Sequence, residues 1–92
     1  MLDTSIPIIN EDFIAESFEN EILLYTIADT KAVYLNETAH LVWKLCIEKK
    51  SVGEMITFLE STYPDQQDVI RADVIETLSN LAKIEAISFT DD

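Results

Sequence analysis

The chain reads Lys31-Ala32-Val33-Tyr34-Leu35-Asn36-Glu37-Thr38-Ala39 at the point where its hydrophobic period changes from about two residues to about 3.6. β-Branched and aromatic residues stand before Asn36, which indicates a short strand. Asn36 itself is a residue type that favours the N-cap of a helix. This stretch therefore predicts a strand that passes directly into a helix, with strands before it and helices after it.

The first third of the chain predicts a three-stranded antiparallel sheet. Residues 13–18 and 21–27 alternate in the manner of strands and are joined by the polar turn Glu19-Asn20. A second turn at Ala28-Asp29-Thr30 leads into the third strand, residues 31–35. No later strand follows this one in the sheet, so its outer edge offers unpaired backbone groups.

Three helices are expected after the sheet. The first should run from Glu37 to about Glu48, with Lys49 and Lys50 at its C-terminal end. Ser51 and Glu54 match a capping box that opens the second helix, which Pro64 ends.

The third helix is expected from Asp68 to Lys83, with Asp65 as its cap. Its apolar residues form a buried stripe at Ile70, Val74, Leu78 and Leu81. One flank of that stripe consists of Arg71, Ile75 and Ala82. Residues 86–89 alternate briefly, which fits a wing strand or a tail packed under the sheet.

Together these elements predict an α+β domain of winged helix-turn-helix type, in which a three-stranded antiparallel sheet precedes three helices. The 92 residues suffice for one domain with one core, expected over about residues 12–89. Such a fold does not by itself give a function.

Composition weighs against several kinds of partner. Six basic and 18 acidic side chains give a formal charge of −12, which repels nucleic-acid phosphates and anionic lipid. No apolar run approaches the ~20 residues that span a bilayer. Because the first residues lack the pattern of a secretion signal, we expect a cytoplasmic protein that binds neither nucleic acid nor membrane.

No catalytic, cofactor or metal site is predicted. His40 and Cys46 lie six residues apart on one helix, about 240° around its axis, so they cannot act as base and nucleophile. Cys46 falls in an apolar pattern and is expected to be a buried thiol. The sole glycine, Gly53, leaves no phosphate-binding loop. The sequence therefore predicts a binding domain and not an enzyme.

Two kinds of binding remain open on these grounds. A winged-helix domain could regulate transcription by binding DNA or another regulator, but the last helix sets Arg71 and Lys83 against three acidic side chains and forms no basic patch. A free strand edge could instead capture an extended peptide as an added strand. That edge could equally be covered by the tail of the chain or by a second copy.

Three groups of residues resemble the PqqD-like family, named for the pyrroloquinoline quinone biosynthesis D protein. They are Leu35-Asn36-Glu37-Thr38-Ala39 with Val42-Trp43-Lys44-Leu45, Ser51-Val52-Gly53-Glu54-Met55-Ile56, and Asp73-Val74 with Leu78-Ser79-Asn80-Leu81. The likeness covers about residues 12–89. It departs at Glu85-Ala86-Ile87, where the family often places glycine before its closing strand.

The resemblance implies a RiPP recognition element, which binds the leader of a ribosomally synthesised precursor peptide. The leader would add beside the third strand and lie between it and the third helix. The implied contacts are Lys31, Ala32, Val33, Tyr34 and Leu35 on the strand and Arg71, Ile75 and Leu78 on the helix. Asp73 matches the family motif and is a possible additional contact.

The resemblance also implies a processing enzyme as partner. The favoured partner is a cysteine-protease-like leader peptidase that acts with an asparagine-synthetase-like cyclase in a lasso peptide pathway, a form of antibiotic biosynthesis. A radical SAM enzyme is the alternative. The protein itself could be a monomer or a homodimer paired through the strand edge.

Overall fold

The computed structural model describes residues 1–19, 21–28 and 31–89. Its main sheet has the strand order β2 (Phe13–Phe18), β3 (Glu21–Thr26) and β4 (Ala32–Leu35), and all its neighbours are antiparallel. This confirms the predicted meander, with the second strand one residue shorter at its end and the third one residue shorter at its start. The predicted turn residues Asn20, Asp29 and Thr30 lie outside the described residues.

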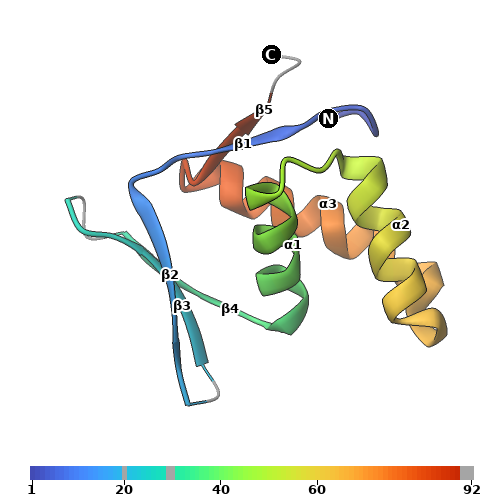
Figure 1. Ribbon diagram of the computed structural model, residues 1–92, viewed down its shortest axis with the longest axis horizontal. Helices are drawn as coiled ribbons and strands as arrows, with labels where there is room; N and C mark the ends of the chain where they lie inside the picture. Colours follow the sequence, from blue (N-terminus) through green and yellow to red (C-terminus); the bar gives the residue numbers. More distant parts are fainter. Residues whose placement is uncertain (20, 29–30, 90–92) are drawn as a thin grey trace.

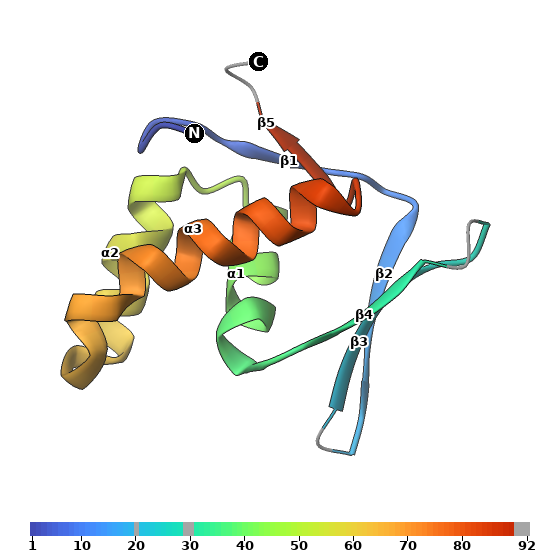
Figure 2. The same ribbon diagram turned by 180° about the vertical axis from the view of Figure 1, so that it is seen from behind.

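Three helices follow the sheet and lie on one side of it (Figures 1 and 2): α1 (Glu37–Ile47), α2 (Val52–Thr62) and α3 (Gln67–Lys83). The predicted start of α1 is confirmed, because the Asn36 side chain accepts a hydrogen bond from the Ala39 N–H at 2.8 Å. The predicted capping box of α2 is also present between Ser51 and Glu54. Local signals thus set the starts of α1 and α2.

The predicted cap of the third helix is wrong. Residues Pro64–Gln66 form a short 3₁₀ helix (η1), and α3 begins at Gln67 with Gln66 as an N-cap that makes no side-chain hydrogen bond. Proline at the first position of a helical turn has a suitable φ and needs no hydrogen bond for its nitrogen. Asp65 therefore lies inside a turn that Pro64 has already started, and it does not occupy the N-cap position of α3.

A second, two-stranded antiparallel sheet joins the ends of the chain: β1 (Pro7–Ile9) pairs with β5 (Ile87–Phe89). The extended piece near the C-terminus was expected, but its partner was not, since three residues that begin with proline carry no periodic signal. Glu85 precedes β5 with a φ of 67°, a left-handed conformation. That conformation favours glycine, the residue that the PqqD-like family often has before its closing strand.

The core lies between the inner face of the main sheet and the three helices. Its members are apolar and include Leu24 from the sheet, Trp43 from α1, Leu59 from α2 and Val74 from α3. Ser5 and Pro7 are buried as well, so packing extends into residues that the sequence left outside the core. Among the described residues, no helix is both long and apolar enough to cross a membrane.

Cys46 is a core residue, as predicted, with 2% of its surface exposed. Burial raises the pKa of its thiol to about 12. At pH 8, roughly one thiol in ten thousand is then ionised, and the thiolate is the reactive form. We expect a disulfide reagent such as DTNB to react very slowly with the folded protein and rapidly after guanidinium is added. Fast reaction without denaturant, in protein that circular dichroism shows to be folded, would contradict this burial.

Candidate functional site

The outer edge of β4 has no strand beside it among the described residues, since the sheet order ends at β4. The Thr26 N–H donates to the Lys31 carbonyl at 2.9 Å, so these two residues form a hydrogen-bonded pair. Such pairs alternate along an antiparallel ladder, which makes Val33 the next residue bonded to β3. The N–H and C=O groups of Ala32 and Tyr34 therefore point away from β3, toward the open edge.

A groove of about 530 Å³ lies beside this edge, between β4 with the start of α1 and one side of α3. Figure 2 shows α3 passing alongside β4. We call this hollow the β4–α3 groove. Its lining combines buried apolar residues with polar side chains: Val33, Tyr34, Leu35, Asn36, Thr38, Ala39, Asp73, Glu76, Thr77, Asn80, Leu81, Lys83 and Ile84.

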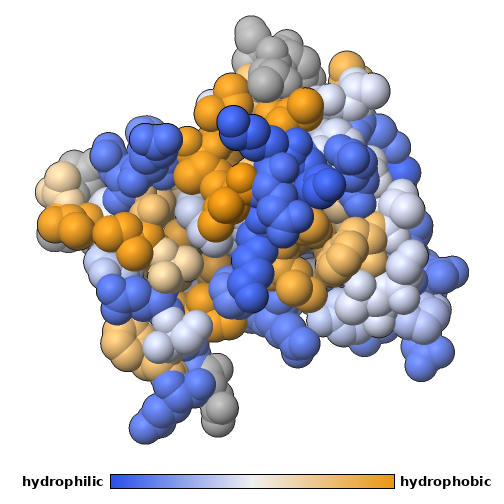
Figure 3. All heavy atoms as spheres, in the orientation of Figure 1, coloured by the Kyte–Doolittle hydropathy of each residue, from blue (hydrophilic) through white to orange (hydrophobic). Residues whose placement is uncertain are grey.

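The groove faces a different flank of α3 from the one that the sequence indicated. With about 100° of rotation per residue, Asp73, Thr77 and Asn80 lie on one side of the buried stripe, and Arg71 and Ile75 lie on the other. The groove lining contains the first three and neither of the last two. The more apolar flank instead approaches the N-terminal segment: Ala82 lines a smaller hollow with Ile8 and Ile9, and hydrophobic atoms gather over β1 and β5 in Figure 3.

The structure brings four of the nine predicted contact residues together in the groove, namely Val33, Tyr34, Leu35 and Asp73. Ala32 is exposed on the same strand. Leu78 is 0% exposed and packs in the core, and Ile75 is 38% exposed outside the groove.

Lys31 has a structural contact at the end of the groove. Its Nζ donates to the Ile84 carbonyl oxygen at 3.3 Å and lies 3.7 Å from a carboxylate oxygen of Glu85. Both partners follow the last turn of α3. Lys31 therefore ties the beginning of β4 to the C-terminal end of α3, and this contact orients the strand along the helix.

Arg71 belongs to a different part of the molecule. Its guanidinium donates two hydrogen bonds to the Asp3 carboxylate, at 2.8 and 3.1 Å, which lowers the pKa of Asp3 and raises that of Arg71. The Asp3 and Ser5 carbonyls accept from the N–H groups of Gly53 and Val52 at the start of α2. Both Asp3 and Arg71 line a second hollow of about 840 Å³. The ion pair thus holds the N-terminal segment over α2.

Replacing Arg71 with alanine tests which of these two roles it has. We expect the Arg71→Ala variant to bind a peptide in the β4–α3 groove within about twofold of the unchanged protein, because the side chain does not line that groove. Amide hydrogen exchange at residues 1–6 should become faster, since their ion pair is lost. A large loss of peptide affinity with unchanged amide exchange would show that Arg71 contacts the peptide.

Several groove residues were not predicted, among them Glu76, Thr77, Asn80 and Lys83. They are polar residues on a helix, a pattern that sequence reasoning assigns to a solvated face. Among the described residues, however, the side chains of Asp73, Thr77 and Asn80 take part in no hydrogen bond or ion pair, although Asp73 and Thr77 are half-buried. Their hydrogen-bonding capacity is therefore available to a ligand.

The groove lining contains the carboxylates of Asp73 and Glu76 and neither histidine nor cysteine. The part of the chain that the structure describes contains no group of three or more His, Cys, Asp or Glu residues that could hold a metal ion. His40 stands on α1 with its pKa lowered by burial and, secondarily, by Lys44. It does not line the groove.

The fold and the groove define a small α+β domain with an open sheet edge beside its third helix. The chain belongs to the PqqD family, because the model of coenzyme PQQ synthesis protein D matches residues 21–87. This confirms the family resemblance seen in the sequence. No curated protein matches the chain.

A solved structure described as TbiB1 in complex with the TbiA(beta) leader peptide has the same fold. It is similar to this chain with a TM-score of 0.75 and 18% sequence identity, over 88% of this chain and 94% of that one. The predicted fold class, a three-stranded antiparallel sheet followed by three helices, is thereby confirmed.

Proposed function

We propose that this protein is a RiPP recognition element, which binds the leader of a ribosomally synthesised precursor peptide as an added strand on β4. The observation that carries the proposal is the open edge at Ala32 and Tyr34 beside the β4–α3 groove. An extended peptide placed there would pair with the outward backbone groups of both residues. Main-chain bonds would supply affinity, and the groove would supply selectivity.

The size and the lining of the groove support a peptide as its occupant. Its volume of about 530 Å³ is typical of a site that buries a few side chains. Leu35, Ala39 and Leu81 are buried residues of the lining, where an apolar leader side chain could pack. Membership of the PqqD family also supports the proposal, as does the likeness to TbiB1, whose structure contains a leader peptide.

The protein would act by presentation and not by catalysis. It would hold the leader while a separate processing enzyme acts on the precursor. The favoured enzyme is the cysteine-protease-like leader peptidase of a lasso peptide pathway, and a radical SAM enzyme is the alternative. This protein would be mixed with each candidate enzyme in turn, and gel filtration would show whether the two form a complex.

The structure does not favour the alternative of a DNA-binding winged helix. Arg71, one of the two basic residues of α3, is paired with Asp3. The groove flank of the same helix presents Asp73 and Glu76. The major groove of DNA would therefore face carboxylates on this helix. The basic contacts that supply most of the affinity for DNA would be missing.

The test is a calorimetric titration with the leader peptide of the precursor encoded beside this protein, at modest salt. Saturable one-to-one binding of micromolar or tighter affinity is expected, and a scrambled leader of the same composition should give no such binding. If the free protein is a homodimer paired through β4, excess leader should convert it to a monomer–leader complex on gel filtration. No detectable heat at high peptide concentration would contradict the proposal.

A further inference from the structure

We infer that the β4–α3 groove selects its peptide by the order of charges along it: a basic residue opposite Asp73 and Glu76, and an acidic residue opposite Lys83. This inference rests on the proposed function and adds a sequence rule to it. The rule concerns position, and it differs from the general attraction that a chain of charge −12 has for basic peptides.

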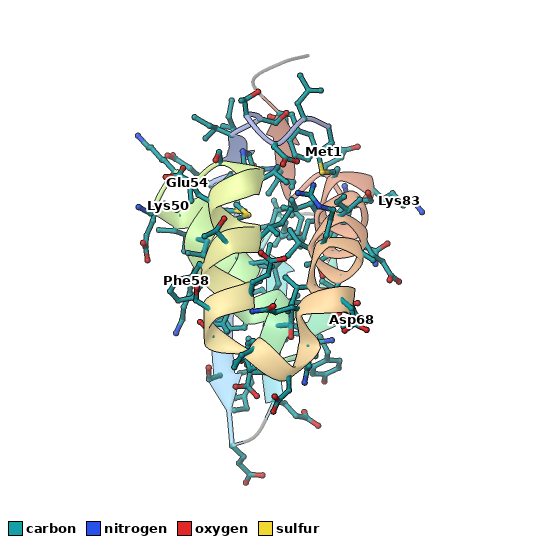
Figure 4. The ribbon with its side chains drawn as sticks, turned by 90° about the vertical axis from the view of Figure 1, so that its right-hand side faces the viewer. Met1, Lys50, Glu54, Phe58, Asp68 and Lys83 are labelled. Atoms are coloured by element: carbon teal, nitrogen blue, oxygen red, sulfur yellow. The ribbon has the colours of Figure 1, made fainter. Side chains whose placement is uncertain are left out.

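The acidic and the basic residues of the groove lie at different positions along α3. Asp73 and Glu76 belong to its middle turns, and Lys83 is its last residue. Figure 4 shows Lys83 at the far end of the helix from Asp68. With a rise of about 1.5 Å per residue, Asp73 and Lys83 are separated by about 15 Å along the helix. An extended peptide covers that length with about four to five residues.

β4 lies alongside α3, and the contacts of Lys31 give its direction relative to the three charged residues of the groove. Its beginning is tied to the C-terminal end of α3 by the contacts of Lys31 with Ile84 and Glu85. Its end, at Leu35, consequently lies toward the acidic part of the groove. An added strand that continues the antiparallel pattern of the sheet would place its earlier residues beside Asp73 and its later residues beside Lys83. The basic residue should therefore come first in the peptide.

The three groove charges are free to act on a peptide. Among the described residues, Asp73, Glu76 and Lys83 form no ion pair, whereas Lys31 is paired with Glu85. Asp73 is also half-buried, so a docked strand would remove most of its remaining water. Charge pairs that lose water on binding discriminate between partners more strongly than fully exposed pairs do.

The rule is tested by selecting a phage-displayed library of random 12-residue peptides on the full chain. Enriched peptides should carry Lys or Arg followed four or five residues later by Asp or Glu. Replacing the basic residue of a selected synthetic peptide with alanine should weaken its binding by about two- to tenfold. On a variant with Asp73→Lys and Glu76→Lys, the first position should change its preference from basic to acidic.

A matched control carries Glu11→Lys and Glu48→Lys, two exposed positions outside the groove lining. It changes the net charge equally and should select the same peptides as the unchanged chain. If the control alters the preference as much as the groove variant does, the net charge of the chain determines which peptides are selected. The inference is then overturned.

The selection also separates this inference from the proposed function. Peptides that require the β4 edge, shown by loss of binding to a Tyr34→Pro variant, but that carry no charge pattern or the reverse order would overturn the charge rule alone. Strand addition would stand in that case. If no peptide is enriched above the library background while the leader still binds in the calorimetric titration, the rule fails and the proposed function stands; if the leader does not bind either, both fail.

Discussion

Replacement of Tyr34 by proline is expected to weaken leader binding by about 10- to 100-fold while the fold survives. The Tyr34 N–H points to the open edge of β4, so an added strand would use it as a donor. Proline removes that donor and leaves a leader carbonyl unpaired, at a cost of about 1–3 kcal/mol, where each 1.4 kcal/mol is about tenfold. Proline is tolerated on an edge strand when its nitrogen faces away from the neighbouring strand.

Two controls make this result interpretable. Tyr34→Ala removes the phenol ring, which is part of a 67% exposed residue, but keeps the N–H, so its smaller loss measures the side chain. Val33→Pro removes an N–H that bonds to β3 and should lower the stability of the sheet itself. Titration calorimetry gives the affinities, and thermal unfolding by circular dichroism gives the stabilities. A folded Tyr34→Pro protein that binds the leader as well as Tyr34→Ala does would exclude strand addition at β4.

The helix starts could be predicted because each depends on residues that are close in sequence. Asn36 accepts from Ala39, three residues later, and Ser51 pairs reciprocally with Glu54. The alternation of the three strands of the main sheet is equally local. In each case the residues that create the signal are the residues that make the hydrogen bonds.

The features that were not predicted depend on contacts between distant residues. β1 pairs with β5 across almost the whole chain, and Arg71 is held by Asp3, 68 residues away. Neither contact leaves a periodic trace in the sequence. The N-cap of α3 was mistaken for a related reason, since Pro64 begins a turn that no pattern of apolar residues marks.

The family resemblance implied contacts at Arg71 and Ile75 on one flank of α3, whereas the groove is lined by the opposite flank. The apolar flank, with Ile75 and Ala82, was expected to face the peptide. The N-terminal segment lies near Ala82 instead, and Ile75 is 38% exposed. The groove uses the polar flank, whose side chains have hydrogen-bonding capacity to offer a ligand. In the sequence, this polar flank looks like an ordinary solvated helix face.

This reassignment leads to a second large expected effect, which comes from filling the groove. Asn80 lines the groove, is exposed and makes no side-chain hydrogen bond among the described residues, so Asn80→Trp should leave the fold intact. The indole would occupy space that the leader needs, and we expect affinity to fall by about tenfold or more, because a docked strand would have to leave its backbone bonds or its packing incomplete.

The matched variant is Ile75→Glu on the opposite flank of the same helix. If Ile75 contacts the leader, as the family resemblance implies, charge at this position should weaken leader binding, whereas the position of the groove predicts a change of about twofold or less. Both variants would be titrated with the same leader, after circular dichroism shows equal helix content. A strong loss for Ile75→Glu with none for Asn80→Trp would mean that the leader lies on the apolar flank of α3, and that the N-terminal segment must move aside to admit it.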